Sequence, residues 1–490
     1  MKKVTALIIM FLILLTACGG NNPIENVETT AGKSDETSST VSEVSTEPVD
    51  KPIFTDNDYG GRKFTILYPE WGYYTTYTFA EEADGDVMND ALFERFLRIN
   101  EELDIKIEWY EGGYIDHILA ELRKTVLGGM DKYDLLLTHC VQDIVTNISD
   151  NLILNWNRIP NINMDKSYWN QSLRKNFETS GMLGYAVNDF ILPDVNAIFF
   201  NKTLSAKLNI ENIYNFVYDN NWTWDKLSEL ALLGTLDLNG DGVFDENDQY
   251  GFVGELSWQF GSVPSSGNEF IVQIDSDGIP QITIKTEKYI RLVEKVWKLL
   301  HEDNKSFTWA YRREYYEGAM AKPPVNFADG SSLFYLSPLY HITGTLRSME
   351  QEYSVLPFPK FDEKQENYLS LNWSGYMAVP FTASDPGLVG KVSELLGYYG
   401  QKIVFPAYYE VLLQQKISRD PDTIKMFDII FEGAVYDFGV ALGLYQITHN
   451  LLTGKGDNFS SYIDSNMKSW QKTLDNYIKA CADYINIHGK

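Results

Sequence analysis

An alternation of strands and helices between residues 63 and 137 constrains the fold of this 490-residue chain more than any other feature. Hydropathy alternates as in strands over 63–68 and 105–109, and 133–137 is a short apolar run typical of a buried strand. Between them, 90–103 and 116–127 carry apolar residues at helical spacing. This β-α-β-α-β order predicts an α/β protein with a parallel sheet and helices on its faces.

Residues that follow the strands of such a sheet are candidate ligand contacts, because ligands bind beyond the carboxyl ends of parallel strands. Trp71 follows the first strand and His139 follows the third. His139 could donate a hydrogen bond to a ligand, or it could be a loop histidine satisfied by the protein itself. Near the other end of the chain, 467–485 places apolar side chains on one helical face, which indicates core packing.

The N-terminus has the features of an export signal. Two lysines precede an apolar run over 6–15 that is too short to span a bilayer, and Cys18 follows it closely. This order resembles a bacterial lipoprotein signal; an ordinary secretory signal with an incidental cysteine is the alternative. We predict a signal peptide over 1–17, a lipidated (palmitate-bearing) Cys18 and a disordered tether over 18–55 that lacks apolar periodicity. The protein is then expected on the extracellular face of the cytoplasmic membrane of a Gram-positive bacterium, held by lipid alone.

The charge balance excludes one class of partner. The chain has 41 Lys+Arg against 68 Asp+Glu, a formal net charge of −27. Nucleic acid is excluded because phosphate binding needs a basic footprint, whereas a neutral ligand suits the negative field of the protein. Three cysteines cannot form a disulfide framework, and whether Cys140 and Cys481 pair is open.

The loop 237–248 matches the twelve-residue calcium loop of EF-hands, in which oxygen ligands recur at fixed positions. Gly242 stands at position 6, where the turn needs a residue without Cβ. Position 12 is Asp248 instead of Glu, and no clear helix follows, so the alternative is an acidic glycine-rich turn without metal. The predicted ligands of a structural Ca²⁺ are Asp237, Asn239, Asp241, Val243 through its carbonyl, Asp245 and Asp248.

Several segments, in order along the chain, carry a family resemblance. A largely apolar stretch over 184–199 leads into Phe200-Asn201-Lys202, where the family has Tyr-Asn-Lys. The later segments are WTWDKLSELA (222–231), YSVLPFPKF (353–361), NWSGYMAVPFTAS (372–384) and 405–430. Together they resemble bacterial extracellular solute-binding proteins of the maltodextrin/oligosaccharide type, which are substrate-binding lipoproteins of ABC transporters.

This resemblance implies two α/β lobes of the periplasmic-binding-protein type, joined by hinge crossovers and closing on a ligand in the cleft between them. By analogy, lobe 1 takes 56–192 and 376–408, and lobe 2 takes 193–375 and 409–490. The implied function is the capture of a carbohydrate, in particular an oligosaccharide, by a monomer that delivers it to ABC permease subunits. No covalent step and no catalytic residue are expected.

Aromatic rings together with carboxylates or amides are the groups that recognise sugars, because rings stack on apolar C–H faces and polar groups bond the hydroxyl rim. Tryptophans are often simply buried, so core packing is the alternative for each of them. Trp373 is favoured, since 372–375 falls at the second cleft loop that the resemblance implies. The predicted ligand contacts are Trp71, His139, Trp169, Asn188, Asp189, Trp258, Trp309 and Trp373.

Two other functions share these features. A secreted glycosidase would need two carboxylates set by tertiary distance, which a sequence does not display. The chain has no G-x-S-x-G, H-E-x-x-H or P-loop motif, and its six histidines lack zinc-ligand spacing. We therefore expect a binding protein and not an enzyme; a sensor module that presents a ligand to a receptor kinase is the remaining alternative.

Overall fold

The computed structural model describes residues 50–141, 144–245, 247–254, 259–303, 305–308, 326–414, 420–454 and 458–489. The chain divides into two compact units, Met1–Pro48 and Val49–Lys490, and all described residues belong to the second. The predicted signal peptide, Cys18 and most of the tether lie outside the described residues. Within the described ranges, no helix combines the length and apolar character needed to cross a membrane.

The first sheet has the strand order β12-β3-β1-β2. Strands β1 (Arg62–Tyr68), β2 (Ile105–Glu111) and β3 (Leu135–Leu137) pair in parallel, and β12 (Met377–Ala378) pairs with β3 antiparallel. Helix α2 (Val87–Leu103) connects β1 to β2, and α3 (Ile115–Leu127) connects β2 to β3. The predicted parallel β-α-β-α-β unit is therefore confirmed, and α2 starts where the Asp86 carboxylate caps the amides of Met88 and Asn89.

The second sheet has the strand order β10-β4-β9-β5-β8. Its strands are β4 (Asn196–Asn201), β5 (Tyr250–Gly254), β8 (Ser306–Thr308), β9 (Ser332–Pro338) and β10 (Tyr353–Leu356). Strand β5 is parallel to β8 and β9, whereas β4 is antiparallel to β9 and β10. Strands β4 and β9 are buried along their whole length, which matches their nearly continuous apolar sequence.

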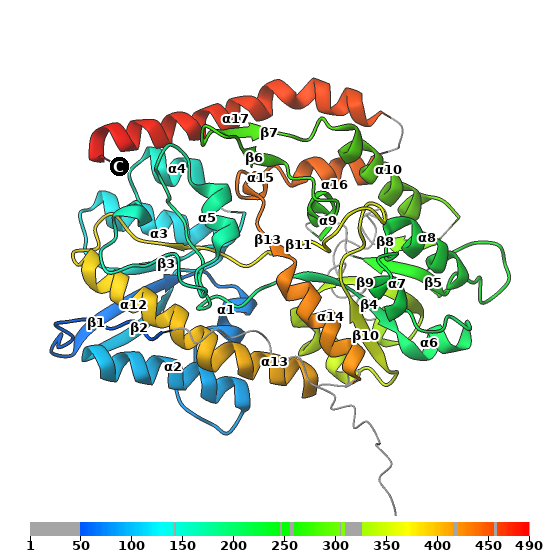
Figure 1. Cartoon of the computed structure of the whole chain (residues 1–490), viewed down its shortest axis with the longest axis horizontal. Helices are drawn as coiled ribbons and strands as arrows, with labels where there is room; N and C mark the ends of the chain where they lie inside the picture. The colour runs from blue at the N-terminus through cyan, green and yellow to red at the C-terminus, as the bar shows by residue number, and fades with distance from the viewer. Residues whose placement is uncertain are drawn as a thin grey trace, which may run out of the picture. The chain divides into compact units, whose positions relative to one another are not determined.

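Two chain segments that we call the crossovers connect the sheets. The first crossover is 188–195, which leads into β4, and the second is 372–376, which leads back to β12. They run antiparallel: one bridge joins Val195 to Asn372, and a second joins Ala186, just before the first crossover, to Met377, just after the second. Beside them β11 (Ser370–Leu371) pairs in parallel with β13 (Ala434–Val435), between the two larger sheets (Figure 1).

A long helix passes close to the first crossover. It consists of α12 (Pro386–Tyr399), a π-helical turn (Gly400–Val404) and α13 (Phe405–Gln414), and it packs against α2 (Figure 1). Gly400 permits this approach, because a Cβ there would stand 2.0 Å from the carbonyl oxygen of Asp189. Next, α14 (Pro421–Glu432) packs on β10, and α17 (Phe459–His488) contacts both α4 (Ile144–Ser149) and β7 (Pro280–Ile282). The predicted C-terminal helix is confirmed and is longer than expected, whereas the lobe boundaries stay a prediction.

The remaining helices and strands surround the two larger sheets. They are α1 (Gly72–Tyr77), α4 (Ile144–Ser149), α5 (Gln171–Phe177), α6 (Lys202–Lys207), α7 (Tyr214–Tyr218), α8 (Trp224–Leu233), α9 (Val263–Ser266), β6 (Val272–Ile274), β7 (Pro280–Ile282), α10 (Glu287–His301), α15 (Phe438–Ala441) and α16 (Gln446–Thr453). Cys140 and Cys481 are buried free thiols, so the structure does not contain a disulfide between them.

Candidate functional site

The carboxyl ends of parallel strands from both sheets meet at one place. Helix α1 follows β1, and a 3₁₀ turn (Leu339–Ile342) follows β9. The Tyr77 hydroxyl at the end of α1 hydrogen bonds the Thr343 hydroxyl, which directly follows that turn. The edge of the first sheet where ligands bind in α/β proteins therefore faces the corresponding edge of the second sheet.

Asp194 lies at this junction with its carboxyl group buried. The second crossover holds its backbone, because the Asp194 N–H donates to the Asn372 Oδ1 atom at 3.0 Å and the Asp194 carbonyl accepts from the Trp373 N–H at 2.8 Å. The side chain is 2% exposed, and its Oδ1 atom has no hydrogen-bond partner among the described residues. Burial alone raises the pKa of Asp194 to about 7. An unpaired carboxylate in the interior is unfavourable, so this position indicates a binding role.

Among the described residues, tyrosines and amides lie close to Asp194, and no lysine or arginine lowers its pKa. Burial is the main cause of the raised pKa of Tyr73, Tyr408 and Tyr436, and the Asp194 charge adds to each. Asn196 lies two residues after Asp194 in the sequence. Its amide nitrogen donates to Ser262 Oγ at 2.7 Å, while its Oδ1 atom lacks a partner among the described residues. We call this group, with Asp194 and Asn196 at its centre, the Asp194 site; it offers hydrogen-bond acceptors to a ligand.

Three predicted ligand residues lie around the Asp194 site. Trp71 and His139 are in ring contact, with centroids 4.4 Å apart, and burial lowers the pKa of His139 to about 4, so its imidazole is neutral at pH 7. The Trp373 indole N–H donates to Ser262 Oγ at 2.7 Å, and its ring meets Tyr445 edge-on at 5.6 Å. Trp373 is only 2% exposed, so protein groups cover most of its ring. The predicted Trp258 and Trp309 lie outside the described residues.

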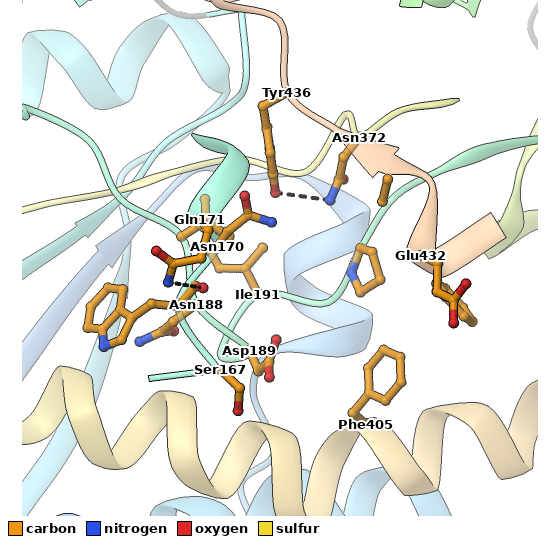
Figure 2. Close-up of a pocket in the computed structure, with 15 residues that line it drawn as sticks. Ser167, Asn170, Gln171, Asn188, Asp189, Ile191, Asn372, Phe405, Glu432 and Tyr436 are labelled. Carbon is orange, nitrogen blue, oxygen red and sulfur yellow. Dashed lines mark hydrogen bonds between the residues drawn. The ribbon is translucent and has the colours of Figure 1, made fainter. Parts of the chain in front are cut away.

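Three other predicted ligand residues, Trp169, Asn188 and Asp189, lie together in a different pocket (Figure 2). We call it the crossover pocket; its volume is about 360 Å³ and its wall also includes Asn372 and Tyr436. Asn372 and Tyr436 separate it from the Asp194 site, since Asn372 hydrogen bonds both the Asp194 backbone and the Tyr436 hydroxyl. The six described candidates therefore occupy two places and not one.

Two of the residues in the crossover pocket have structural hydrogen bonds. The Trp169 indole N–H donates to the Glu394 carboxylate at 2.7 Å, and the Asn188 amide donates to the Ser393 carbonyl at 2.8 Å. Glu394 also accepts from the Tyr168 hydroxyl at 2.5 Å. Asp189 differs from both, because burial raises the pKa of its carboxyl group to about 7 and only a bond to Gln401 counteracts this.

The sequence analysis did not include Asp194 and Asn196 among the candidates. One signal was available, because these two residues are the polar exceptions in the apolar run 190–200 that becomes the first crossover and β4. Their isolation in an apolar segment indicates two buried polar groups, and such groups need partners. What the sequence does not show is that one side-chain oxygen of each has no hydrogen-bond partner in the part of the chain that the structure describes.

The predicted calcium loop has the internal hydrogen bonds of a tight, oxygen-lined turn. Asp237 accepts from the amides of Gly240 (2.6 Å) and Gly242 (2.7 Å), and both glycines have positive φ. Asp248, which is 1% exposed, accepts from the amides of Leu238 (2.9 Å) and Asp245 (2.8 Å). In the described part of the loop, which omits residue 246, no three acidic, histidine or cysteine side chains are grouped as metal ligands. The metal site stays a prediction.

Solved structures of known proteins share this architecture. The ABC substrate-binding protein Lmo0181 from Listeria monocytogenes, in complex with cycloalternan, matches with a TM-score of 0.55 and 12% identity over 85% of this chain and 99% of that chain. The galacto-N-biose-/lacto-N-biose I-binding protein of the ABC transporter from Bifidobacterium longum matches with a TM-score of 0.54 and 14% identity over 85% and 98%. UspC from M. tuberculosis matches with a TM-score of 0.54 and 15% identity over 84% and 100%.

No protein-family model and no curated protein matches the sequence. The structural matches establish that the chain has the two-lobed α/β fold of periplasmic-binding-protein type. The predicted fold class is confirmed, and so is the family resemblance at the level of the fold. In this fold the Asp194 site lies where the crossovers meet the facing edges of the two sheets.

Proposed function

We propose that this chain is the substrate-binding lipoprotein of an ABC importer, which captures a carbohydrate between its lobes and delivers it to membrane permease subunits. The fold supports this proposal, because it is shared by the ABC substrate-binding protein Lmo0181 in complex with cycloalternan and by the ABC-transporter protein GL-BP (the galacto-N-biose-/lacto-N-biose I-binding protein) in complex with lacto-N-biose. The observation that carries it is the buried Asp194 carboxyl oxygen without a protein partner, among the described residues, at the meeting point of the two sheet edges.

The chemistry of the Asp194 site suits a sugar. A sugar hydroxyl can donate to Asp194 Oδ1, and a second hydroxyl can donate to Asn196 Oδ1, so that both buried acceptors become satisfied. The ring of Trp71 and the neutral imidazole of His139 offer an aromatic surface beside them. Because ligand contacts to both sheet edges exist only when the lobes are together, ligand binding would favour the closed state by population shift.

A binding role fits the site better than glycoside hydrolysis. Hydrolysis needs two carboxylates flanking the scissile bond, and a second carboxylate close to Asp194 would raise its pKa further. Among the described residues, burial is the only cause of the raised pKa of Asp194. We therefore propose reversible capture without a covalent step. A ligand-presenting sensor module would use the same site, and it would differ only in its membrane partner.

Isothermal calorimetry with a panel of neutral mono- and oligosaccharides tests this function. At least one sugar should bind one-to-one and be recovered intact by mass spectrometry. Asp194→Asn should weaken that binding at least about tenfold, because a charge-assisted hydrogen bond is lost. The matched control Glu211→Gln removes one charge from an exposed position and should leave affinity unchanged. Shortened sugars after incubation would show an enzyme instead, and the absence of binding by every sugar would reject carbohydrate capture.

We also propose lipid anchoring at Cys18 on the outer face of the cytoplasmic membrane. The sequence order of lysines, apolar run and Cys18 supports this localisation. Radiolabelled palmitate should enter the wild-type protein in a bacterial host and not the Cys18→Ala variant, which should appear in the culture medium. Equal labelling of both proteins would reject anchoring at Cys18.

A structural Ca²⁺ in the 237–248 loop is proposed on the ligand spacing and on the turn geometry. The residues that would hold it are Asp237, Asn239, Asp241, Val243 and Asp248, with Asp245 acting through water. The Asp237 and Asp248 hydrogen bonds already orient two carboxylates within the loop. Such an ion would stabilise the loop and take no part in sugar binding.

A further inference from the structure

The wall of the crossover pocket is formed by segments that lie far apart in the sequence. The first crossover supplies Asp189, the second supplies Asn372, and the end of α14 with β13 supplies Glu432 and Tyr436. Phe405 enters from the first turn of α13, directly after the π-helical turn that lies against Asp189. Local π-helix is frequent at functional sites, and a pocket of about 360 Å³ has the size of a small-molecule site.

The charges of this pocket are of one sign. Asp189 and Glu432 contribute two carboxylates, and none of the lining residues is a lysine, arginine or histidine. Neither carboxylate forms an ion pair with any described residue; Asp189 has only the neutral Gln401 amide as a side-chain partner. Figure 2 shows the Asp189 and Glu432 carboxylates and the Phe405 ring around the same open space.

Aromatic rings form the rest of the surface. Phe405 and Phe431 meet edge-to-face with centroids 5.4 Å apart, and both line the pocket together with Tyr436 and Trp169. Ring faces attract cations, and aromatic surroundings with carboxylates are the combination that binds ammonium groups in proteins. A neutral ligand could use the rings but would leave the partly buried Asp189 carboxylate without a counter-charge, whereas the exposed Glu432 carboxylate stays hydrated.

We propose that the crossover pocket is a second ligand site, separate from the Asp194 site, and that it binds a small organic ammonium ion between Asp189, Glu432 and the rings of Phe405 and Phe431. Asp189 supplies a partly buried charge, Glu432 an exposed charge, and the rings the apolar contact. The ligand of this site does not depend on the identity of the ligand at Asp194, because Asp189, Glu432, Phe405 and Phe431 are not part of the Asp194 site; Asn372 and Tyr436 form the wall that both sites share.

The ionisation of Asp189 should make the affinity of the crossover pocket for a cation depend on pH. Burial raises the pKa of Asp189 to about 7, and the groups that face it are Gln401 from the π-helical turn, Glu432 from α14 and Tyr436. A cation binds the ionised carboxyl, so its affinity should rise with pH. Because the ionised fraction grows from about a tenth at pH 6 to about nine tenths at pH 8, affinity should rise about tenfold over that interval.

Calorimetric titration of the sugar-free protein with choline and putrescine tests the site. At least one of these ammonium probes should bind, and 3,3-dimethyl-1-butanol, the uncharged analogue of choline, should bind at least about tenfold more weakly or not at all. Asp189→Asn should weaken binding at least about tenfold and abolish the pH dependence, and Glu432→Gln should weaken it less. Glu211→Gln, a matched loss of one exposed charge elsewhere, should change nothing.

Three results would overturn the proposal. They are no binding of either ammonium probe at millimolar concentration, equal affinity for choline and its uncharged analogue, and full binding by Asp189→Asn. The comparison of choline with its analogue uses only the wild-type protein, so it decides the question even if a variant folds poorly. Sugar binding is measured separately, so failure of this proposal leaves the function at the Asp194 site untouched.

Discussion

Replacing Asp194 by Asn should make the ligand-free protein more stable at pH 8 while weakening its binding of sugar at least about tenfold. The wild-type carboxyl group is 2% exposed, has no partner for Oδ1 among the described residues and has its pKa raised by burial to about 7. An aspartate in the unfolded chain has a pKa of about 3.9. Between these two values the folded chain retains a proton that the unfolded chain has released, so stability falls as pH rises.

The size of this effect follows from the two pKa values. Each pKa unit corresponds to about 1.4 kcal/mol, so the full penalty of the ionised Asp194 is about 4 kcal/mol. It is absent below about pH 4 and complete above about pH 7. The amide introduced by Asp194→Asn carries no charge but still needs hydrogen bonds, so we expect a gain of about 2–4 kcal/mol at pH 8 and little difference near pH 4.

The difference in unfolding free energy between the wild type and Asp194→Asn can be measured by urea unfolding of the sugar-free proteins at pH 4.5 and pH 8, followed by tryptophan fluorescence. Asp437→Asn is the matched contrast, because Asp437 is also buried with a pKa raised to about 6 but accepts from the amides of Ile271 (2.7 Å) and Gly439 (2.8 Å). That variant should lose about 2 kcal/mol or more, since an amide cannot satisfy the same donors. The reasoning would be refuted if Asp194→Asn destabilised the chain at pH 8 as Asp437→Asn does.

Further variants separate structural groups from the ligand site. Glu394→Gln should destabilise the chain by about 2 kcal/mol or more, because Glu394 accepts from Tyr168, Trp169 and Asn163, and sugar affinity of the folded fraction should stay the same; an unchanged melting temperature would contradict this. Gly400→Ala should cost about 1–3 kcal/mol in urea unfolding, since its Cβ would stand 2.0 Å from the Asp189 carbonyl oxygen, and wild-type stability would show that the helix does not approach so closely. Calcium should raise the melting temperature of the wild-type chain above its value in chelator, and Asp237→Ala should not respond; identical melting of the wild type in both buffers would argue against the metal.

The sequence was sufficient to predict the first sheet because its elements are local and strongly periodic. The strand predicted at 63–68 is β1, and the helix predicted at 116–127 is α3 to within one residue. The helix α1 was not predicted, because GYYTTY has little helical preference and is held by tertiary contacts such as those of Tyr74 and Tyr77. Local pattern therefore determined the elements, while packing between the sheets determined α1.

The candidate site could be predicted only in part, for a related reason. Trp71 and His139 were found because position after a parallel strand is readable from sequence. Asp194 was missed, because a buried oxygen without a partner is a property of the assembled crossovers and not of any motif. Asp189 and Asn188 were grouped with the sugar contacts by their closeness in sequence to the first crossover, yet this segment has two sides, and the structure places them in the crossover pocket.

A crystal structure of the chain with the tightest-binding oligosaccharide tests the central proposal most directly. The sugar should lie between the carboxyl ends of β1 and β3 on one side and of β5 and β9 on the other, with a hydroxyl within hydrogen-bond distance of Asp194 Oδ1. A sugar seated in the crossover pocket, or one that leaves Asp194 Oδ1 without a partner, would contradict the assignment of the Asp194 site as the place where the carbohydrate is captured.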